Sequence, residues 1–210
     1  MESNDEIEQK LTEAWANRKS TLRASFNTAI HLFQESKKAN YQKGVADSEK
    51  ILGYCYWRFS NYSKSLSHSL SAIEIYKSLN DKKGEADTLN SLGAVYMFQN
   101  ENEKRLSCNL NCLELRKEIK DYNGVSGSMN NIGETYFEMS DYKNAEKWLI
   151  DCLEYEHSAI DSLAWANHNL AKIQIEYSNW KLAKEYFLKS LELTKVDKYD
   201  VLTCETYLKL

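Results

Sequence analysis

Apolar residues recur along this chain with the spacing of paired amphipathic helices. The clearest stretch covers residues 124–150, where small and apolar side chains share one helical face, then a turn falls at Ser140-Asp141, and a second helical face follows. The first face holds Met129, Ile132, Gly133 and Tyr136, and the second holds Tyr142, Ala145, Leu149 and Cys152. The pattern predicts two helices joined by a short turn.

The same helix-turn-helix pattern recurs through the chain. The pairs Leu52-Gly53, Leu92-Gly93 and Ile132-Gly133 follow one another at intervals of 40 residues, and Leu170-Ala171 comes 38 residues later. A fixed period in this range is typical of a solenoid, in which stacked repeats share one continuous core. The sequence therefore predicts an all-α solenoid of antiparallel helix pairs.

Applying this period to the whole sequence predicts that residues 1–210 form a single solenoid domain of about five repeats. The predicted repeats are 5–43, 44–83, 84–123, 124–160 and 161–198, and residues 199–210 begin a further one. That last stretch would be an orphan helix without its hairpin partner, which indicates a fragment of a longer protein. An uncapped solenoid end exposes apolar surface, so we expect self-association through the C-terminal end.

Glycine occurs at two kinds of position in the repeats. The Gly of each Leu-Gly pair lies inside a helix, where its lack of a side chain predicts close approach of two crossing helices. The links between repeats, such as Leu79 to Gly84, combine Asn, Asp and Gly. We interpret these three residue types as the source of the left-handed and capping conformations of the turns.

Several columns of residues recur together and resemble tetratricopeptide repeats. Besides the Leu-Gly pairs, Tyr56, Tyr96 and Tyr136 keep the 40-residue register. Small residues occupy most positions of two further columns, namely Ser65, Arg105, Ala145 and Ala183, and then Ala72, Cys112, Cys152 and Ser190. The resemblance implies a right-handed superhelix whose first helices line a concave groove for a protein or peptide ligand.

The 40-residue unit is similar to the variant of that family in kinesin light chains, Pins-type adaptors, Rap-type peptide receptors and the sensory regions of bacterial signalling proteins. The resemblance implies a binding protein that does no chemistry. The first hypothesis is a regulatory, sensory N-terminal part of a larger cytoplasmic signalling protein. The alternative is a stand-alone peptide receptor or assembly adaptor without an output domain.

Composition narrows the partners and the compartment. The net charge is −4 with acids and bases interspersed, whereas a nucleic-acid groove requires a basic stripe. No apolar run approaches the length of a membrane span, and the polar first residues are not those of a signal peptide. Five cysteines without a CxxC pair suit reduced thiols, so we expect a cytoplasmic protein that binds neither nucleic acid nor membrane.

Matching the family's groove positions onto this chain gives two adjacent polar columns. The first is Lys50, Asn90, Asn130 and His168, and the second is Ile51, Ser91, Asn131 and Asn169. Asn is a poor helix former, so its accumulation inside helices favours a use, and side-chain amides can hold an extended peptide backbone. The alternative is that these amides bond neighbouring helices or water.

A third column is apolar and consists of Trp57, Met97, Phe137 and Ile175. It is either an apolar floor for the ligand or, as apolar stripes usually are, core packing between successive helices. Nearby charges on Arg58, Glu134 and Lys172 would orient a charged peptide.

The sequence carries no motif for catalysis, a metal or a cofactor. Cys108 and Cys112 are spaced for one helical face, but no further ligands stand at a matching spacing for zinc. There is no phosphate-binding loop, HExxH motif or nucleophile elbow. We therefore expect a binding protein without catalytic, metal or cofactor sites.

Overall fold

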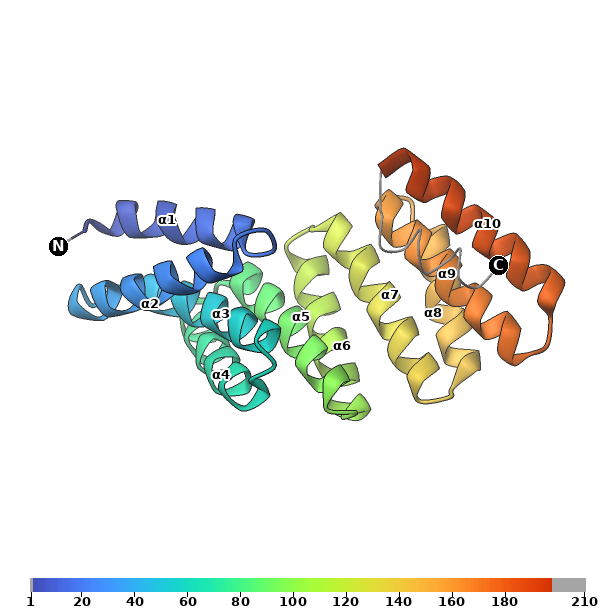
Figure 1. The fold of residues 1–210 in the computed structure, drawn as a ribbon, viewed down its shortest axis with the longest axis horizontal. Coiled ribbons are helices and arrows are strands. Elements are labelled where there is room, and N and C mark those ends of the chain that lie inside the picture. Colours follow the sequence, from blue (N-terminus) through green and yellow to red (C-terminus); the bar gives the residue numbers. More distant parts are fainter. Residues whose placement is uncertain (1, 198–210) are drawn as a thin grey trace. The chain divides into compact units, whose positions relative to one another are not determined.

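The computed structural model describes residues 2–197, and these form ten α-helices and no strand (Figure 1). The helices follow one another through the chain as α1 (Asn4–Asn17), α2 (Leu22–Lys38), α3 (Gln42–Arg58), α4 (Tyr62–Leu79), α5 (Lys82–Phe98), α6 (Asn102–Glu118), α7 (Tyr122–Glu138), α8 (Tyr142–Glu154), α9 (Ile160–Glu176) and α10 (Trp180–Asp197). The prediction of an all-α fold is confirmed. The predicted orphan helix at 199–210 and its self-association lie outside the described residues.

The 40-residue period arises from two helices and two short turns of nearly constant length. Six of the helices are 17 residues long, and three residues separate most consecutive helices. The middle residue of most turns has a positive φ, between 53° and 59°, at Asn40, Ser60, Asn80, Asn100, Lys120, Ser140 and Ser178. The turn itself therefore repeats about every 20 residues.

Each of these turns closes its helix with the hydrogen bonding of a Schellman motif. The amide of the residue after the positive-φ residue donates to the carbonyl five residues earlier, as in Asp81 N to Tyr76 O at 2.9 Å and Asp141 N to Tyr136 O at 2.9 Å. Where this residue is Asn61, Asp81, Asp121 or Asp141, its side chain also caps the next helix. The Asp81 carboxylate accepts from Gly84 N at 2.9 Å, and Asp121 accepts from Gly124 N at 3.0 Å.

The glycines do not supply the left-handed turn conformation, so that part of the sequence interpretation was wrong. No glycine among the described residues has a positive φ, and Gly84 and Gly124 lie within the first turn of their helices. A Cβ on Gly84 would lie 2.3 Å from the Tyr76 ring, and one on Gly124 would lie 2.5 Å from Arg116 Cδ. These glycines make room for a large side chain of the preceding helix.

The glycines of the Leu-Gly pairs have the predicted role. A Cβ on Gly53 would lie 2.5 Å from Ser69 Oγ, one on Gly93 would lie 2.9 Å from Asn109 Oδ1, and one on Gly133 would lie 2.7 Å from Leu149 Cγ. Each glycine lies where the two helices of a pair cross, so the prediction of close approach is confirmed. The small-residue columns of the second helices are buried as well, including Arg105.

The link between α8 and α9 departs from the other turns. Helix α8 has only 13 residues, its C-cap Tyr155 is extended, and no residue from Tyr155 to Ala159 has a positive φ. Ser158 Oγ instead donates to the Cys152 carbonyl at 2.6 Å and so satisfies the end of α8. This link explains why the spacing falls from 40 to 38 residues after Gly133.

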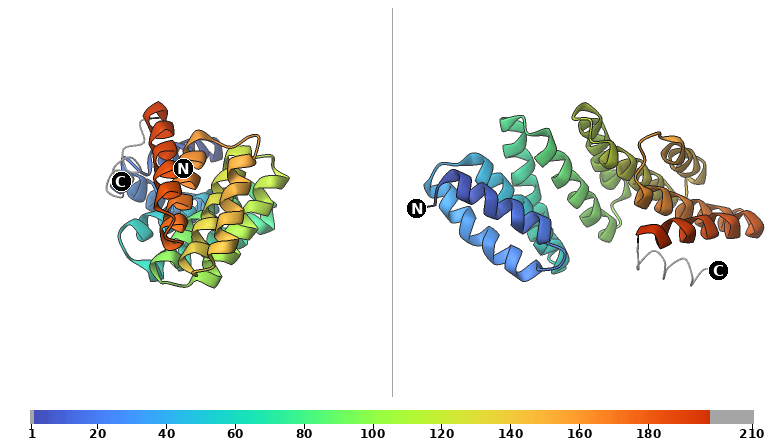
Figure 2. Two further views of the ribbon diagram at one scale, coloured as in Figure 1. Left: turned by 90° about the vertical axis from the view of Figure 1, so that its right-hand side faces the viewer. Right: turned by 90° about the horizontal axis from the view of Figure 1, so that it is seen from above.

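The chain forms two compact units, residues 1–115 and residues from 116 onward. In the first, α3 packs against α2 and α4, α5 packs against α3 and α4, and α1 covers α2 and α3. In the second, α9 packs against α7, α8 and α10, and Figure 2 shows α9 and α10 in orange and red beside each other. Whether residues 1–210 act as one domain stays a prediction.

Candidate functional site

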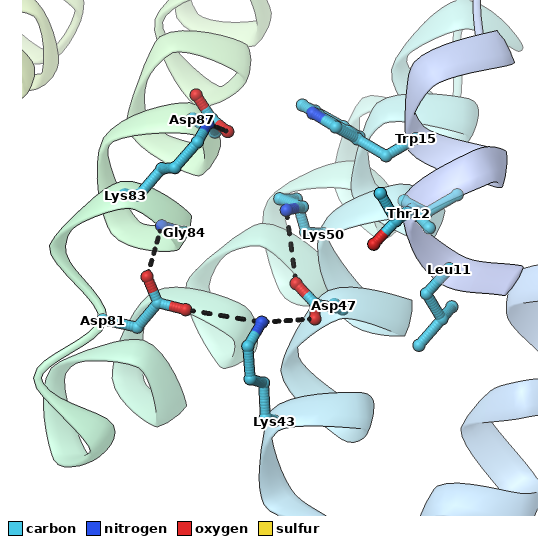
Figure 3. Close-up of a pocket in the computed structure, with 11 residues that line it drawn as sticks. Leu11, Thr12, Trp15, Lys43, Asp47, Lys50, Asp81, Lys83, Gly84 and Asp87 are labelled. Carbon is cyan, nitrogen blue, oxygen red and sulfur yellow. Dashed lines mark hydrogen bonds and ion pairs between the residues drawn. The ribbon is translucent and has the colours of Figure 1, made fainter. Parts of the chain in front are cut away.

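The first unit contains a cleft of about 180 Å³ between α1, α3 and α5. Figure 3 shows Lys83 and Asp87 of α5 facing Leu11, Thr12 and Trp15 of α1, with α3 side chains between them. The lining is rich in charge of both signs and comprises Leu11, Thr12, Trp15, Lys43, Asp47, Lys50, Ile51, Asp81, Lys83, Gly84 and Asp87. It includes one predicted groove residue, Lys50, and its neighbour Ile51.

Asp47 is the electrostatic centre of this first cleft. Lys43 Nζ lies 2.9 Å from Asp47 Oδ2, Lys50 Nζ lies 3.3 Å from Oδ1, and the Tyr76 hydroxyl donates to Oδ1 at 2.5 Å. Burial alone would raise the pKa of Asp47, but Lys50, Tyr76 and Lys43 together outweigh it and hold that pKa below its usual value. The carboxylate thus joins α3 to α4 in a charged network.

Lys50 is committed to this network. Its side chain is 9% exposed, its ammonium is paired with Asp47, and it lies 4.7 Å from the centroid of the Trp15 ring. Lys43 also bridges Asp47 to Asp81, 3.6 Å away, at the start of α5. In the first cleft, these polar contacts therefore link α3 to α4 and to the start of α5.

The second unit contains a cleft of about 200 Å³ between α7 and α9, and three residues of the two predicted polar columns line it. Its lining consists of Asn130, Asn131, Glu134, Trp165 and Asn169. Asn169 Nδ2 donates to Asn130 Oδ1 at 3.3 Å, which links the two helices. The alternative in which the amides bond a neighbouring helix therefore holds for Asn130 and Asn169, and both residues also line the cleft.

Trp165 belongs to the second cleft and the sequence reasoning missed it. It lies one helical turn before Asn169 and on the same face of α9, and its indole is half-buried. The corresponding positions of the earlier repeats hold Asp47 and Asp87, which line the first cleft. Extending the polar columns by one helical turn would have found all three residues.

His168 does not face the second cleft. Its side chain is buried, with its ring centroid 5.3 Å from Phe187 of α10 and 5.8 Å from Trp165. It packs between α9 and α10. Asn90 is half-buried on α5 and is not among the residues that line either cleft.

The predicted apolar floor is half-buried and packs between helices. The Trp57 ring lies 5.4 Å from Tyr54 and 6.2 Å from Phe98, and Phe137 lies 5.5 Å from Tyr142. Met97 and Ile175 are also half-buried. None of the four lines either cleft.

Two of the three charges predicted beside this floor, Lys172 and Arg58, contact aromatic side chains. Lys172 places its ammonium 4.4 Å from the Phe137 centroid. Arg58 donates to the Tyr54 hydroxyl at 3.3 Å and lies 5.7 Å from the Trp57 ring. Of the three, Glu134 alone lines a cleft.

The thiols of the described chain are buried in helix crossings. Burial raises the pKa of Cys55 to about 12 and that of Cys108 and Cys152 to about 11. Cys112 Sγ donates to Ala86 O at 3.3 Å and Cys152 Sγ to Ser126 O at 3.4 Å, so both pack as small core residues. Within residues 2–197, no group of three or more His, Cys, Asp or Glu side chains is placed to hold a metal ion.

The second unit also matches a known family by sequence. The family model described as tetratricopeptide repeat matches residues 124–196, which include most of α7, all of α8 and α9, and the residues that line the second cleft. Residues 124–196 contain tetratricopeptide repeats. A comparison with curated protein sequences finds no match.

Solved structures extend the tetratricopeptide fold to nearly the whole chain. The apo form of RapI superposes with a TM-score of 0.76 at 18% identity, covering 92% of this chain and 72% of that one. A Rap protein complexed with competence and sporulation factor gives a TM-score of 0.80 at 13% identity, covering 98% and 58%. BtubC from P. vanneervenii gives 0.67 at 13% identity, covering 93% and 91%.

At these identities the likeness is one of fold, and it confirms the predicted solenoid of helix pairs. Tetratricopeptide repeats typically mediate protein–protein interaction. Within the described part, no helix is both long and apolar enough to cross a membrane.

Proposed function

We propose that this tetratricopeptide repeat protein binds an extended peptide segment in the second cleft, with Asn130, Asn131 and Asn169 holding its backbone. The observation behind the proposal is the convergence of three amides on a hollow of about 200 Å³ between two first helices. A carboxamide both donates and accepts, as a peptide unit does, so it pairs with a backbone whatever the side chains are.

The Asn130–Asn169 bond prepares the cleft for this role. The bond fixes both side chains across the helix interface and occupies only one oxygen and one N–H. Each amide retains further hydrogen-bonding capacity, and side chains held in place lose less entropy when a ligand binds. Trp165 adds a flat apolar wall against which a peptide side chain can pack.

The fold likeness to Rap proteins supports a regulatory setting. One of those structures is a complex with competence and sporulation factor, so a fold of this kind accommodates such a ligand. We therefore propose that the chain is the sensory part of a larger cytoplasmic signalling protein, with a stand-alone peptide receptor or assembly adaptor as the alternative. A peptide that changes the activity of an attached domain would favour the first, and one that only recruits a partner would favour the second.

The proposal is tested by selecting ligands from a random linear peptide library displayed on phage and titrating them by calorimetry. Asn131→Ala should weaken the selected peptides several-fold, because one side-chain hydrogen bond contributes about 0.5–1.5 kcal/mol. Asn111→Ala, an exposed Asn on α6, is the matched control and should leave affinity unchanged. Failure to select any peptide, or equal binding by Asn131→Ala with an unchanged melting temperature, would contradict the proposal.

A further inference from the structure

The first unit carries a row of alternating aromatic and cationic side chains that runs from α1 across α3 to α5. This arginine–aromatic row consists of Trp15, Arg18, Tyr54, Arg58, Trp57 and Phe98. The Arg18 guanidinium lies 3.6 Å from the centroid of the Trp15 ring and 5.0 Å from that of Tyr54. Arg58 donates to the Tyr54 hydroxyl at 3.3 Å. Both guanidinium groups therefore lie against one tyrosine.

Neither arginine of the row forms an ion pair with a carboxylate within the described part of the chain. Arg18 donates one N–H to the Trp15 carbonyl at 2.5 Å, and its Nε is buried without a hydrogen-bond partner. Burial lowers the pKa of Arg18, although the nearby Tyr54 and Asp87 oppose this effect. A partly buried cation without a counter-ion is unfavourable, so an anion bound beside it would stabilise the site.

The N–H edges of both guanidinium groups remain available to a ligand. A guanidinium that stacks on an aromatic ring uses its face, whereas its five N–H groups point outward in its plane. Arg18 and Arg58 each make a single side-chain hydrogen bond to the described residues, so most of these donors remain. A carboxylate matches such an edge, because its two oxygens can accept two parallel hydrogen bonds.

The row also offers apolar surface beside its charges. Phe98 is 53% exposed, and its ring lies 6.2 Å from that of Trp57. Arg58 is exposed as well. Aromatic residues and arginines are enriched where protein–protein interfaces gain most of their affinity. A partner that fits the row therefore combines carboxylates with apolar side chains.

The aromatic rings of the row are poorly placed to stack nucleic-acid bases. Arg18 covers Trp15, and Lys50 lies 4.7 Å from the centroid of the same ring. Tyr62 stacks on Phe98 with the centroids 5.9 Å apart. Single-stranded nucleic acids bind by stacking on open ring faces along a basic groove, whereas this chain has a net charge of −4. An acidic protein segment therefore fits the row better.

We propose that the arginine–aromatic row is a docking surface for an acidic peptide segment, whose carboxylates bind Arg18 and Arg58 and whose apolar residues contact Phe98. The inference goes beyond the proposed function, because the row lies in the first unit and shares no residue with the lining of the second cleft. Charge complementarity selects this partner, since both guanidinium groups lack a carboxylate of the described chain.

The first test titrates hexaglutamate into the ¹⁵N-labelled chain and follows the indole N–H signals of Trp15 and Trp57 by NMR. The signals are assigned with Trp15→Phe and Trp57→Phe. Hexaglutamate should give saturable shifts that weaken as salt is added, because salt screens the charges. Hexaglutamine, which has the same length without the charge, should give far smaller shifts. Equal shifts from hexaglutamine, or none from hexaglutamate, would overturn the inference.

Matched variants locate the interaction on the row. Arg58→Gln removes one exposed charge and should weaken hexaglutamate binding about two- to fivefold. Arg18→Gln should do the same, with a thermal melt to check that α1 stays folded. Arg23→Gln removes an exposed charge on α2 outside the row and should bind as the parent does. Unchanged binding by Arg58→Gln, or equal weakening by Arg23→Gln, would overturn the inference.

An oligonucleotide tests the choice of partner. Hexathymidylate offers phosphates and stacking bases in a chain of similar length. It should bind more weakly than hexaglutamate at the same salt concentration. Tighter binding of hexathymidylate that is lost in Arg58→Gln would make the row a nucleic-acid surface and would overturn the assignment to an acidic peptide.

Discussion

At the scale of single residues, this fold depends on glycines at positions where a Cβ atom would collide with a neighbouring side chain. Gly53, Gly93 and Gly133 lie where paired helices cross, and Gly84 and Gly124 lie under Tyr76 and Arg116 of the preceding helix. Two different contacts therefore require glycine at two positions of the third and fourth repeats. The left-handed turn positions, where glycine is usually expected, hold Asn, Ser and Lys instead.

Replacing Gly133 and Gly127 with Ala should have opposite effects on stability. A Cβ at position 133 would lie 2.7 Å from Leu149 Cγ, an overpacking that destabilises by about 1–3 kcal/mol. At position 127 the nearest atom would be 3.9 Å away, so Gly127→Ala should gain about 0.5–1 kcal/mol from helix propensity. Urea denaturation measures both, and equal effects would refute the close-approach explanation.

At the scale of elements, ion pairs as well as apolar packing hold the helices of the first unit together. Asp47 of α3 receives Lys43, Lys50 and the Tyr76 hydroxyl, and Lys43 reaches Asp81 at the start of α5. Tyr76 is fully buried, and its burial, together with the nearby Asp47 carboxylate, raises the pKa of its hydroxyl. One carboxylate thus positions three consecutive helices.

This network makes stability depend on acid pH. Because the pKa of Asp47 is lower in the folded chain than the unfolded value of about 3.9, its contribution is present above that value and is lost as pH falls through the folded pKa. Asp47→Asn should destabilise by about 3 kcal/mol at pH 7, since it leaves buried Lys50 without its partner. The difference from the parent should shrink as the pH falls below about 4.

Urea denaturation at several pH values between about 7 and 3 measures this effect. Asp5→Asn, which changes an exposed carboxylate on α1, is the control and should stay within about 0.5 kcal/mol of the parent throughout. A destabilisation by Asp47→Asn that is constant with pH would show that packing, and not charge, is responsible.

At the scale of the whole molecule, the sequence was sufficient for the architecture because the repeat is visible in it. The Leu-Gly and Tyr columns recur every 40 residues. One such period contains two helices and two short turns. Helix starts were harder to predict. Gly84 and Gly124 look like turn residues in sequence, whereas their role depends on the size of a side chain in the preceding helix.

The candidate site could be predicted only in part. The polar columns led to Asn130, Asn131 and Asn169, and Glu134 was predicted as a nearby charge; the structure gathers all four around one cleft. They could not show that His168 packs on Phe187 or that Lys50 is committed to Asp47, because those outcomes depend on side-chain direction and partners. Trp165 was missed because it lies one helical turn before the predicted polar columns.

The most direct measurement of the central claim is an NMR titration of the labelled chain with a peptide selected from the library. Peptide binding in the second cleft predicts that the largest shifts gather at the side chains of Asn131, Trp165 and Asn169, on the facing surfaces of α7 and α9. Saturation of these shifts should parallel the calorimetric affinity. Shifts that gather instead on the outer surfaces of α8 and α10, with the Trp165 indole unmoved, would contradict it.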